Sequence, residues 1–201
     1  MLKKYKLVIK SILAMLVVVI FANTALAQRS QMPMLERTSQ PVGHYEFCQR
    51  YQSECQPNPS AVIPTLTEDL WSQLIEVNGS VNTVIIPRTD EEIFGVAERW
   101  AYPTKQGDCE DFALLKQYML QRAGVPRSAL LITVLRQRNG AGHAVLTVRT
   151  SEGDFVLDNL DERILPWNET DYLYLKRQSE LDSGKWIGIA DDRDILVGSV
   201  R

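Results

Sequence analysis

The stretch Gly107-Asp108-Cys109-Glu110-Asp111 decides how this sequence is interpreted. Apolar residues recur downstream of it at helical spacing, as at Phe112 and Met119, and Gly124 is a stop signal, so a helix is predicted over 109–123. Cys109 then lies in the first turn, where unpaired backbone N–H groups and the helix dipole stabilise a thiolate. The sequence therefore presents one cysteine in a position suited to nucleophilic chemistry.

The periodicity of the apolar residues changes along the chain around this helix. Before it, Thr67 and Thr89 begin two further predicted helices, the first ending at Gly79 and the second running toward Trp100. After it the period becomes two, as in strands over 130–136, 143–149, 155–159, 172–175 and 185–189. Helices followed by antiparallel strands indicate an α+β fold in which the N-terminal helices pack on an antiparallel sheet.

A nucleophilic cysteine needs a base, and the chain has two histidines. His44 lies in the polar region near the start of the chain, whereas His143 opens a predicted strand after a glycine-containing loop. The order of cysteine followed by histidine and then an acid is that of papain-like enzymes. We therefore expect His143 to act as general base and acid toward Cys109.

The third member of the group is predicted from strand geometry. If 150–153 forms a four-residue hairpin loop, Arg149 faces Asp154 and Val145 faces Asp158. Asp158 is then the diagonal neighbour of His143 on the same face of the sheet, at roughly 7–8 Å between backbone positions. Asp154, at the loop end, and Asp161, on the other face, are the competitors.

Acidic residues on both sides of the cysteine raise the cost of a thiolate. A like charge about 6 Å away costs about 2.8 kcal/mol at an effective dielectric constant near 20. A bound divalent cation would remove this conflict, because carboxylates favour Ca²⁺ or Mg²⁺, and an irregular cluster suits Ca²⁺ better. The alternative is that Asp108, Glu110 and Asp111 only cap the helix N-terminus.

Cys48 and Cys55 are the two cysteines outside this motif. On one straight helix their Cα atoms would be about 10.5 Å apart, beyond the roughly 7 Å that a disulfide tolerates. A disulfide between them therefore requires the chain to bend. The alternative is a metal site formed by His44, Cys48 and Cys55, which lacks a fourth ligand and standard zinc spacing.

The first 27 residues resemble a secretory signal peptide. Four lysines precede an uncharged apolar run, and Ala25-Leu26-Ala27 provides the cleavage site. The run is too short to span a membrane, so no membrane span is expected after cleavage. Cleavage removes four lysines and no acid, which lowers the formal charge from −3 to −7. The expected compartment is oxidising and favours disulfides.

Length and charge bound the remaining possibilities. A chain of 201 residues with 45% hydrophobic residues suits one globular domain, and no basic block indicates nucleic-acid binding. We expect a flexible N-terminal arm over 28–44 and a single catalytic domain over 45–201.

These motifs resemble the bacterial transglutaminase-like cysteine proteinase family. The residues that carry the resemblance are Asp90-Glu91-Glu92-Ile93-Phe94-Gly95, Glu98-Arg99-Trp100, Gly107-Asp108-Cys109-Glu110-Asp111, Gly142-His143-Ala144-Val145-Leu146, Val156-Leu157-Asp158-Asn159 and Leu165-Pro166-Trp167. They span about residues 45 to 190. The resemblance implies a papain/transglutaminase-like fold in which Cys109 is the nucleophile, His143 the base and Asp158 the residue that orients it.

The resemblance also implies a cofactor and partners. Some members are periplasmic proteases that release large adhesins from the cell surface in biofilms. They require Ca²⁺, with the acids that flank the nucleophile implicated; here these are Asp108 and Glu110. They are restrained by an inner-membrane receptor that senses cyclic-di-GMP. This favours calcium binding over simple helix capping.

Two other functions fit the same residues. The enzyme could be an amidase or transglutaminase that passes the acyl group to an amine, or the chain could be a non-catalytic binding module that retains the fold.

The backbone N–H of Cys109 is a plausible oxyanion donor. A second donor does not emerge from the sequence, and Trp100 and Gln106 are the candidates.

Overall fold

A seven-stranded antiparallel sheet organises the computed structural model, which describes residues 31–193. The predicted signal peptide lies outside the described residues. The strand order is β1-β9-β8-β4-β5-β6-β7. Its strands are β1 (Met34–Thr38), β4 (Leu130–Arg136), β5 (Gly142–Thr150), β6 (Gly153–Leu157), β7 (Leu165–Pro166), β8 (Leu173–Gln178) and β9 (Trp186–Ile189). The α+β fold predicted from the sequence is confirmed.

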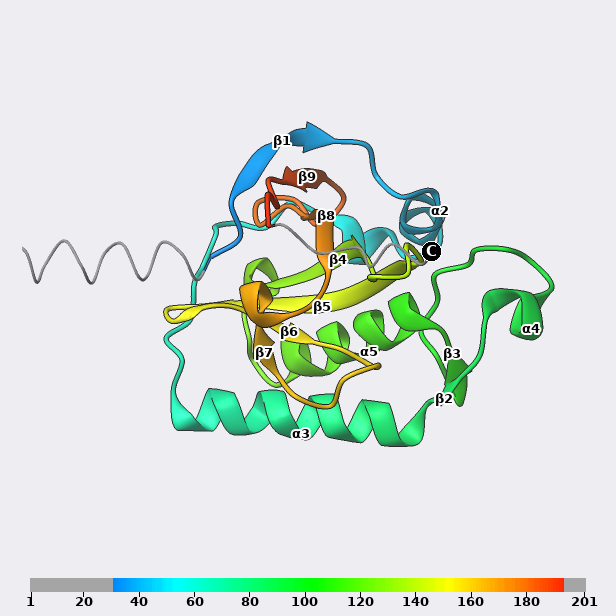
Figure 1. The fold of residues 1–201 in the computed structure, drawn as a ribbon, viewed down its shortest axis with the longest axis horizontal. Helices are drawn as coiled ribbons and strands as arrows, with labels where there is room; N and C mark the ends of the chain where they lie inside the picture. Colours follow the sequence, from blue (N-terminus) through cyan, green and yellow to red (C-terminus); the bar gives the residue numbers. More distant parts are fainter. Residues whose placement is uncertain (1–30, 194–201) are drawn as a thin grey trace, which may run out of the picture.

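The described residues form four helices, α2 (Val42–Arg50), α3 (Glu68–Val84), α4 (Asp90–Phe94) and α5 (Cys109–Arg122). Two of them, α5 and α3, cover one side of the sheet in two layers. Helix α5 lies against β4 and β5, with α3 on its outer side (Figure 1). The main core joins the three layers, as the buried Leu74 of α3, Phe112 of α5 and Leu146 of β5 show. Since α5 is enclosed between a helix and a sheet, its first turn is held firmly in place.

The hairpin of β5 and β6 has the register that the sequence predicted. Arg149 pairs with Asp154 and Leu146 with Leu157, so Val145 comes opposite Asp158 just beyond the last paired residue of β6. Thr150 and Gly153 also pair, which leaves a tighter loop than expected without changing the register. Gly153 has a φ of 127°, a conformation that favours glycine.

The predicted flexible arm over 28–44 is wrong from Met34 onward. Strand β1 pairs with β9, and α2 begins at Val42. Met32 is also buried, and its backbone N–H donates to the Asp154 carboxylate at 2.8 Å. These partners lie more than 100 residues away in sequence, so local composition did not reveal them.

Two predicted helix ends are also wrong. Helix α3 continues through Gly79 to Val84, because the space around Gly79 is open and Val81 still packs in the core. Helix α4 ends at Phe94 instead of running toward Trp100. Gly95 terminates it with a φ of 68°. No helix among residues 31–193 is long and apolar enough to cross a membrane.

Candidate active site

Cys109 is the first residue of α5 and points toward the start of β5. A short parallel pair, β2 (Ile86–Pro87) with β3 (Gln106–Gly107), leads the chain into the helix. Gly107 is needed there, because a Cβ at this position would lie 2.7 Å from the Asp111 Cβ and 3.1 Å from the Pro103 Cβ. The backbone N–H of Ala144, the residue after His143, acts on the Cys109 sulfur. The thiol and the start of β5 are therefore neighbours.

His143 and Asp158 are joined by a hydrogen bond. The imidazole Nε2 lies 2.8 Å from the Asp158 Oδ1, and both side chains are buried. Asp158 also accepts from the Tyr172 hydroxyl at 2.6 Å and from the backbone N–H of Leu160 at 3.0 Å. Burial opposes ionisation of Asp158, but the bonds from His143, Tyr172 and Leu160 outweigh it and hold the pKa of the carboxyl below its usual value.

The Cys109 thiol is bonded to a carboxyl group in this structure. It donates to the Glu110 Oε2 at 3.2 Å, and no hydrogen bond joins it to His143 within residues 31–193. Burial, followed by the charges of Glu110 and Asp108, raises the pKa of the thiol well above its usual value. In this state the acids oppose formation of the thiolate, as the sequence led us to expect.

A cluster of three carboxyl groups, two buried and one half-buried, lies beside the thiol. Asp90, Asp108 and Glu110 each offer an oxygen, and these oxygens lie within 4.8 Å of one another. Burial and the neighbouring Asp90 charge raise the pKa of Asp108 to about 6, and burial with the Asp108 charge raises that of Glu110 to about 9. Asp111 lies next to the cluster and accepts from the Ala101 backbone N–H, and burial raises its pKa to about 8.

This cluster fits a calcium ion. Asp90, Asp108 and Glu110 each have one buried carboxylate oxygen that makes no hydrogen bond. Buried polar atoms normally have a partner, and Ca²⁺ binds carboxylate oxygens as hard ligands. Asp108 and Glu110 were predicted for this role. The sequence analysis missed Asp90, because its local pattern indicated only a helix start and nothing in the spacing linked it to residue 108.

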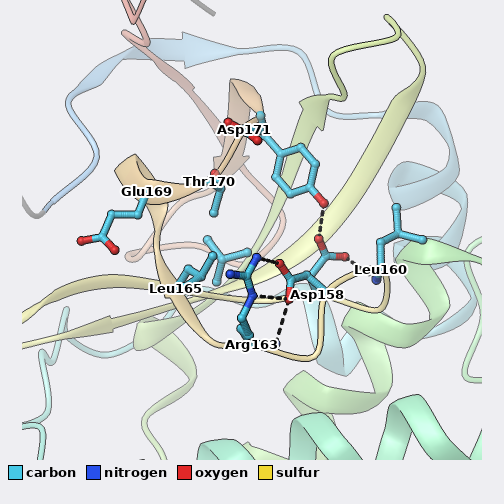
Figure 2. Close-up of a pocket in the computed structure, with 10 residues that line it drawn as sticks. Asp158, Leu160, Arg163, Leu165, Glu169, Thr170 and Asp171 are labelled. Carbon is cyan, nitrogen blue, oxygen red and sulfur yellow. Dashed lines mark hydrogen bonds and ion pairs between the residues drawn. The ribbon is translucent and has the colours of Figure 1, made fainter.

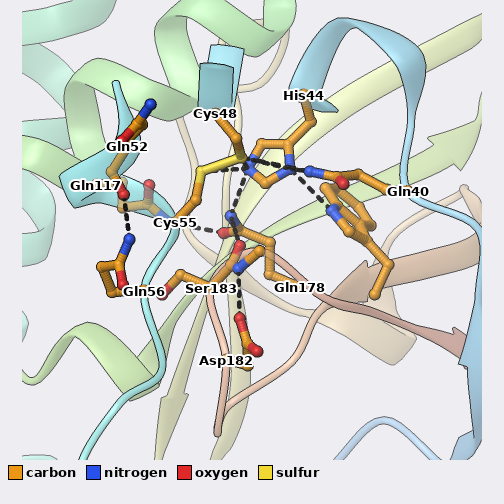
Figure 3. The surroundings of a disulfide bond; sticks show 12 residues. Gln40, His44, Cys48, Gln52, Cys55, Gln56, Gln117, Gln178, Asp182 and Ser183 are labelled. Atoms are coloured by element: carbon orange, nitrogen blue, oxygen red, sulfur yellow. Dashed lines mark hydrogen bonds between the residues drawn. A yellow bond between two sulfur atoms is a disulfide. The ribbon is translucent and has the colours of Figure 1, made fainter. Parts of the chain in front are cut away.

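The predicted disulfide between Cys48 and Cys55 is present. Helix α2 ends at Arg50, and the chain then bends through a short 3₁₀ helix (Gln52–Cys55), which brings the two Cα atoms to 5.6 Å. Figure 3 shows the bond next to His44. The alternative metal site with His44 is wrong, because the disulfide occupies both sulfurs. Burial, together with the Arg127 charge, lowers the pKa of His44 to about 3.

The other candidates have different partners. Asp154 forms buried ion pairs with Arg177 and Arg149, and Asp161 pairs with Arg163. Trp100 and Gln106 were the candidates for the second oxyanion donor. The Trp100 indole N–H already donates to the Glu98 carboxylate at 2.6 Å. Gln106 has an exposed side chain.

Known proteins match both the sequence and the structure. The family described as bacterial transglutaminase-like cysteine proteinase matches residues 34–194. Calcium-bound LapG of Legionella pneumophila is similar in structure, with 27% identity, a TM-score of 0.50, and coverage of 62% of this chain and 71% of that chain. The EGTA-treated form of the same protein has 27% identity, a TM-score of 0.49, and coverage of 61% and 68%. A comparison with curated proteins gives no match.

Proposed function

This chain belongs to the bacterial transglutaminase-like cysteine proteinase family, and from that membership we propose that it is a calcium-dependent endopeptidase built on Cys109, His143 and Asp158. Its activity as a cysteine protease follows from the family. The choice of residues is supported most directly by the buried His143–Asp158 hydrogen bond of 2.8 Å. His143 lies next to Ala144, whose backbone N–H acts on the Cys109 sulfur.

The proposed reaction has two stages. His143 takes the proton from the Cys109 thiol, and the sulfur attacks the carbonyl carbon of the scissile peptide bond. The carbonyl oxygen becomes an oxyanion that the Cys109 backbone N–H stabilises. His143 then donates the proton to the departing amine as the C–N bond breaks, leaving an acyl-thioester. In the second stage His143 takes a proton from water, which attacks the thioester, releases the carboxylic acid and regenerates the thiol.

Asp158 supports the base throughout this cycle. It accepts from the Nε2 side of the imidazole, which leaves the other ring nitrogen for the proton of the thiol. Its low pKa keeps it ionised at neutral pH, so it stabilises the imidazolium that forms in each stage. Loss of this carboxylate leaves the nucleophile in place but removes the group that orients its base.

Calcium completes the proposal. Asp90, Asp108 and Glu110 would hold the ion, whose charge would neutralise these carboxylates and lower the cost of a thiolate at Cys109. Similarity to a LapG in a calcium-bound form supports this assignment. Without the ion, Glu110 is the hydrogen-bond acceptor of the thiol, an arrangement that favours the neutral, unreactive form.

The resemblance also extends the proposal to location and partners. We propose a periplasmic enzyme, exported by a signal peptide over 1–27, that cleaves a large surface adhesin and is restrained by an inner-membrane receptor for cyclic-di-GMP. The acid-rich composition is compatible with a secreted protein without nucleic-acid partners.

Cleavage of an adhesin fragment tests the proposal. The full chain is incubated with the N-terminal region of a candidate adhesin, with calcium or with EGTA, and the products are identified by mass spectrometry. We expect addition of water at one peptide bond, only with calcium, and no cleavage by Cys109→Ala. Asp158→Asn should lower kcat at least 100-fold. Calcium-independent cleavage or persistent cleavage by Cys109→Ala would refute the proposal, and an isopeptide product would show acyl transfer instead.

A further inference from the structure

Asp158 is bonded on both of its carboxylate oxygens. Oδ1 accepts from the His143 Nε2 at 2.8 Å and from the Leu160 backbone N–H at 3.0 Å. Oδ2 accepts from the Tyr172 hydroxyl at 2.6 Å. A carboxylate can rotate about its Cβ–Cγ bond, so a donor on the second oxygen decides how the first oxygen is directed. Tyr172 has no part in the proton transfers proposed for Cys109 and His143.

Tyr172 reaches the site from a distant part of the chain. It lies directly before β8, and its ring centroid is 5.7 Å from that of His143, with the ring planes inclined by 58°. The aromatic ring therefore packs on the imidazole while its hydroxyl binds the carboxylate. One side chain contacts both members of the His143–Asp158 pair.

Tyr172 also borders a cavity of about 200 Å³. Figure 2 shows the cavity, with the bond to Asp158 as a dashed line. Both Asp158 and Tyr172 line it, together with Asp161 and Arg163, whereas His143 does not. A cavity of this size can hold water, and the imidazole on which the Tyr172 ring packs does not border it.

We propose that Tyr172 is a positioning residue of the protease. Its hydroxyl holds the Asp158 carboxylate so that Oδ1 faces the imidazole, and its ring keeps water away from the His143–Asp158 bond. A hydrogen bond to a charged group is stronger than one between neutral groups, and water in direct contact competes with it. This inference rests on the function proposed for Cys109, His143 and Asp158.

Two substitutions separate the two parts of this role, and a neighbouring tyrosine supplies the control. Tyr172→Phe removes the hydroxyl and keeps the ring, whereas Tyr172→Leu removes both. Tyr174→Phe also removes one phenol hydroxyl from the same segment, but that hydroxyl bonds Thr170 at 2.8 Å and not Asp158.

The readouts are kcat, KM and the proton NMR signal of the His143 Nε2–H in the full chain. The chain has only two histidines, so His143→Ala assigns the signal. Tyr172→Phe should lower kcat about 10-fold with KM nearly unchanged, and should shift the Nε2–H signal upfield. Tyr172→Leu should in addition speed exchange of this proton with water. Tyr174→Phe should leave kcat and the signal as in the parent chain.

The proposal is overturned if Tyr172→Phe keeps kcat within about twofold and leaves the signal in place, or if Tyr174→Phe changes both as much. The NMR measurement needs no substrate. If the parent chain cleaves nothing, the proposed function fails, while the signal in Tyr172→Phe still decides whether Tyr172 positions Asp158. A circular dichroism melt identifies any variant that does not fold, and the remaining variant then carries the test.

Discussion

Replacing Asp90 with asparagine should stabilise the calcium-free protein and weaken the stabilisation that calcium provides. Asp90 is buried, and one of its carboxylate oxygens has no hydrogen-bond partner. Its other oxygen accepts from the Arg99 backbone N–H, a bond that the amide oxygen of asparagine can keep. Asp90→Asn therefore removes one negative charge from the cluster while preserving the local backbone contact.

The magnitude follows from the geometry of the cluster. At 4.8 Å, the outer limit of the separations between its oxygens, two like charges repel by about 3.5 kcal/mol at an effective dielectric constant near 20. With its pKa raised to about 9, Glu110 is largely protonated at neutral pH, so Asp90 and Asp108 form the repelling pair. Removing one charge should raise the melting temperature in EGTA by up to about 10 °C.

With calcium the stability advantage of the variant should shrink. A neutral amide oxygen attracts Ca²⁺ less than a carboxylate does, so we expect the variant to bind calcium at least 10-fold more weakly, which is about 1.4 kcal/mol less stabilisation at a fixed calcium concentration. Thermal melts in EGTA and in calcium, together with a calorimetric titration, measure both effects. Glu91→Gln is the matched control, because it removes an exposed charge from the same helix.

The reasoning is refuted if Asp90→Asn is no more stable than the parent chain in EGTA, or if its gain in melting temperature on adding calcium equals that of the parent. The first result would mean that Asp90 is not ionised or is fully screened in the calcium-free protein. The second would mean that the ion binds elsewhere. The second result would remove Asp90 from the proposed site.

Three further predictions concern other parts of the molecule. Burial raises the pKa of Glu110 to about 9 and that of Asp111 to about 8. The stability that these two groups contribute is full below pH 4 and is lost as the pH rises to 9. The melting temperature in EGTA should therefore fall as the pH rises, and Glu110→Gln should reduce this fall. Removing the Cys48–Cys55 disulfide with two serines should cost about 2.4 kcal/mol of unfolding free energy, measured by denaturant titration. Gly107→Ala should lower the free energy of unfolding by about 1–3 kcal/mol and should lower kcat, because the alanine Cβ would lie 2.8 Å from the Asp111 Oδ2. An unchanged kcat would contradict this close fit.

The parts of the fold that the sequence predicted depend on local patterns. The helix that begins at Cys109, the strand over 130–136 and the register of the β5–β6 hairpin all follow from periodicity and turn residues close in sequence. The disulfide could be expected because the chain offers two cysteines besides Cys109. Strand β1 could not be expected, because its mostly exposed residues owe their order to backbone bonds with β9.

The same distinction applies to the candidate site. The proximity of His143 and Asp158 was predicted from the hairpin, and the structure brings them into contact. Asp90 and Tyr172 were missed, because each reaches the site through the tertiary fold, and an isolated aspartate or tyrosine carries no signal of its own. The roles of Cys109, His143 and Asp158 stay predictions until the variants are assayed.

The pairing of β1 with β9 ties completion of the sheet to completion of the chain. Residues 34–38 have no strand partner until residues 186–189 have been synthesised, and the Trp186 indole also donates to His44 beside the disulfide at 3.0 Å. Contacts so distant in sequence slow folding, and a chain that stops short leaves the edge of β8 unpaired and open to aggregation.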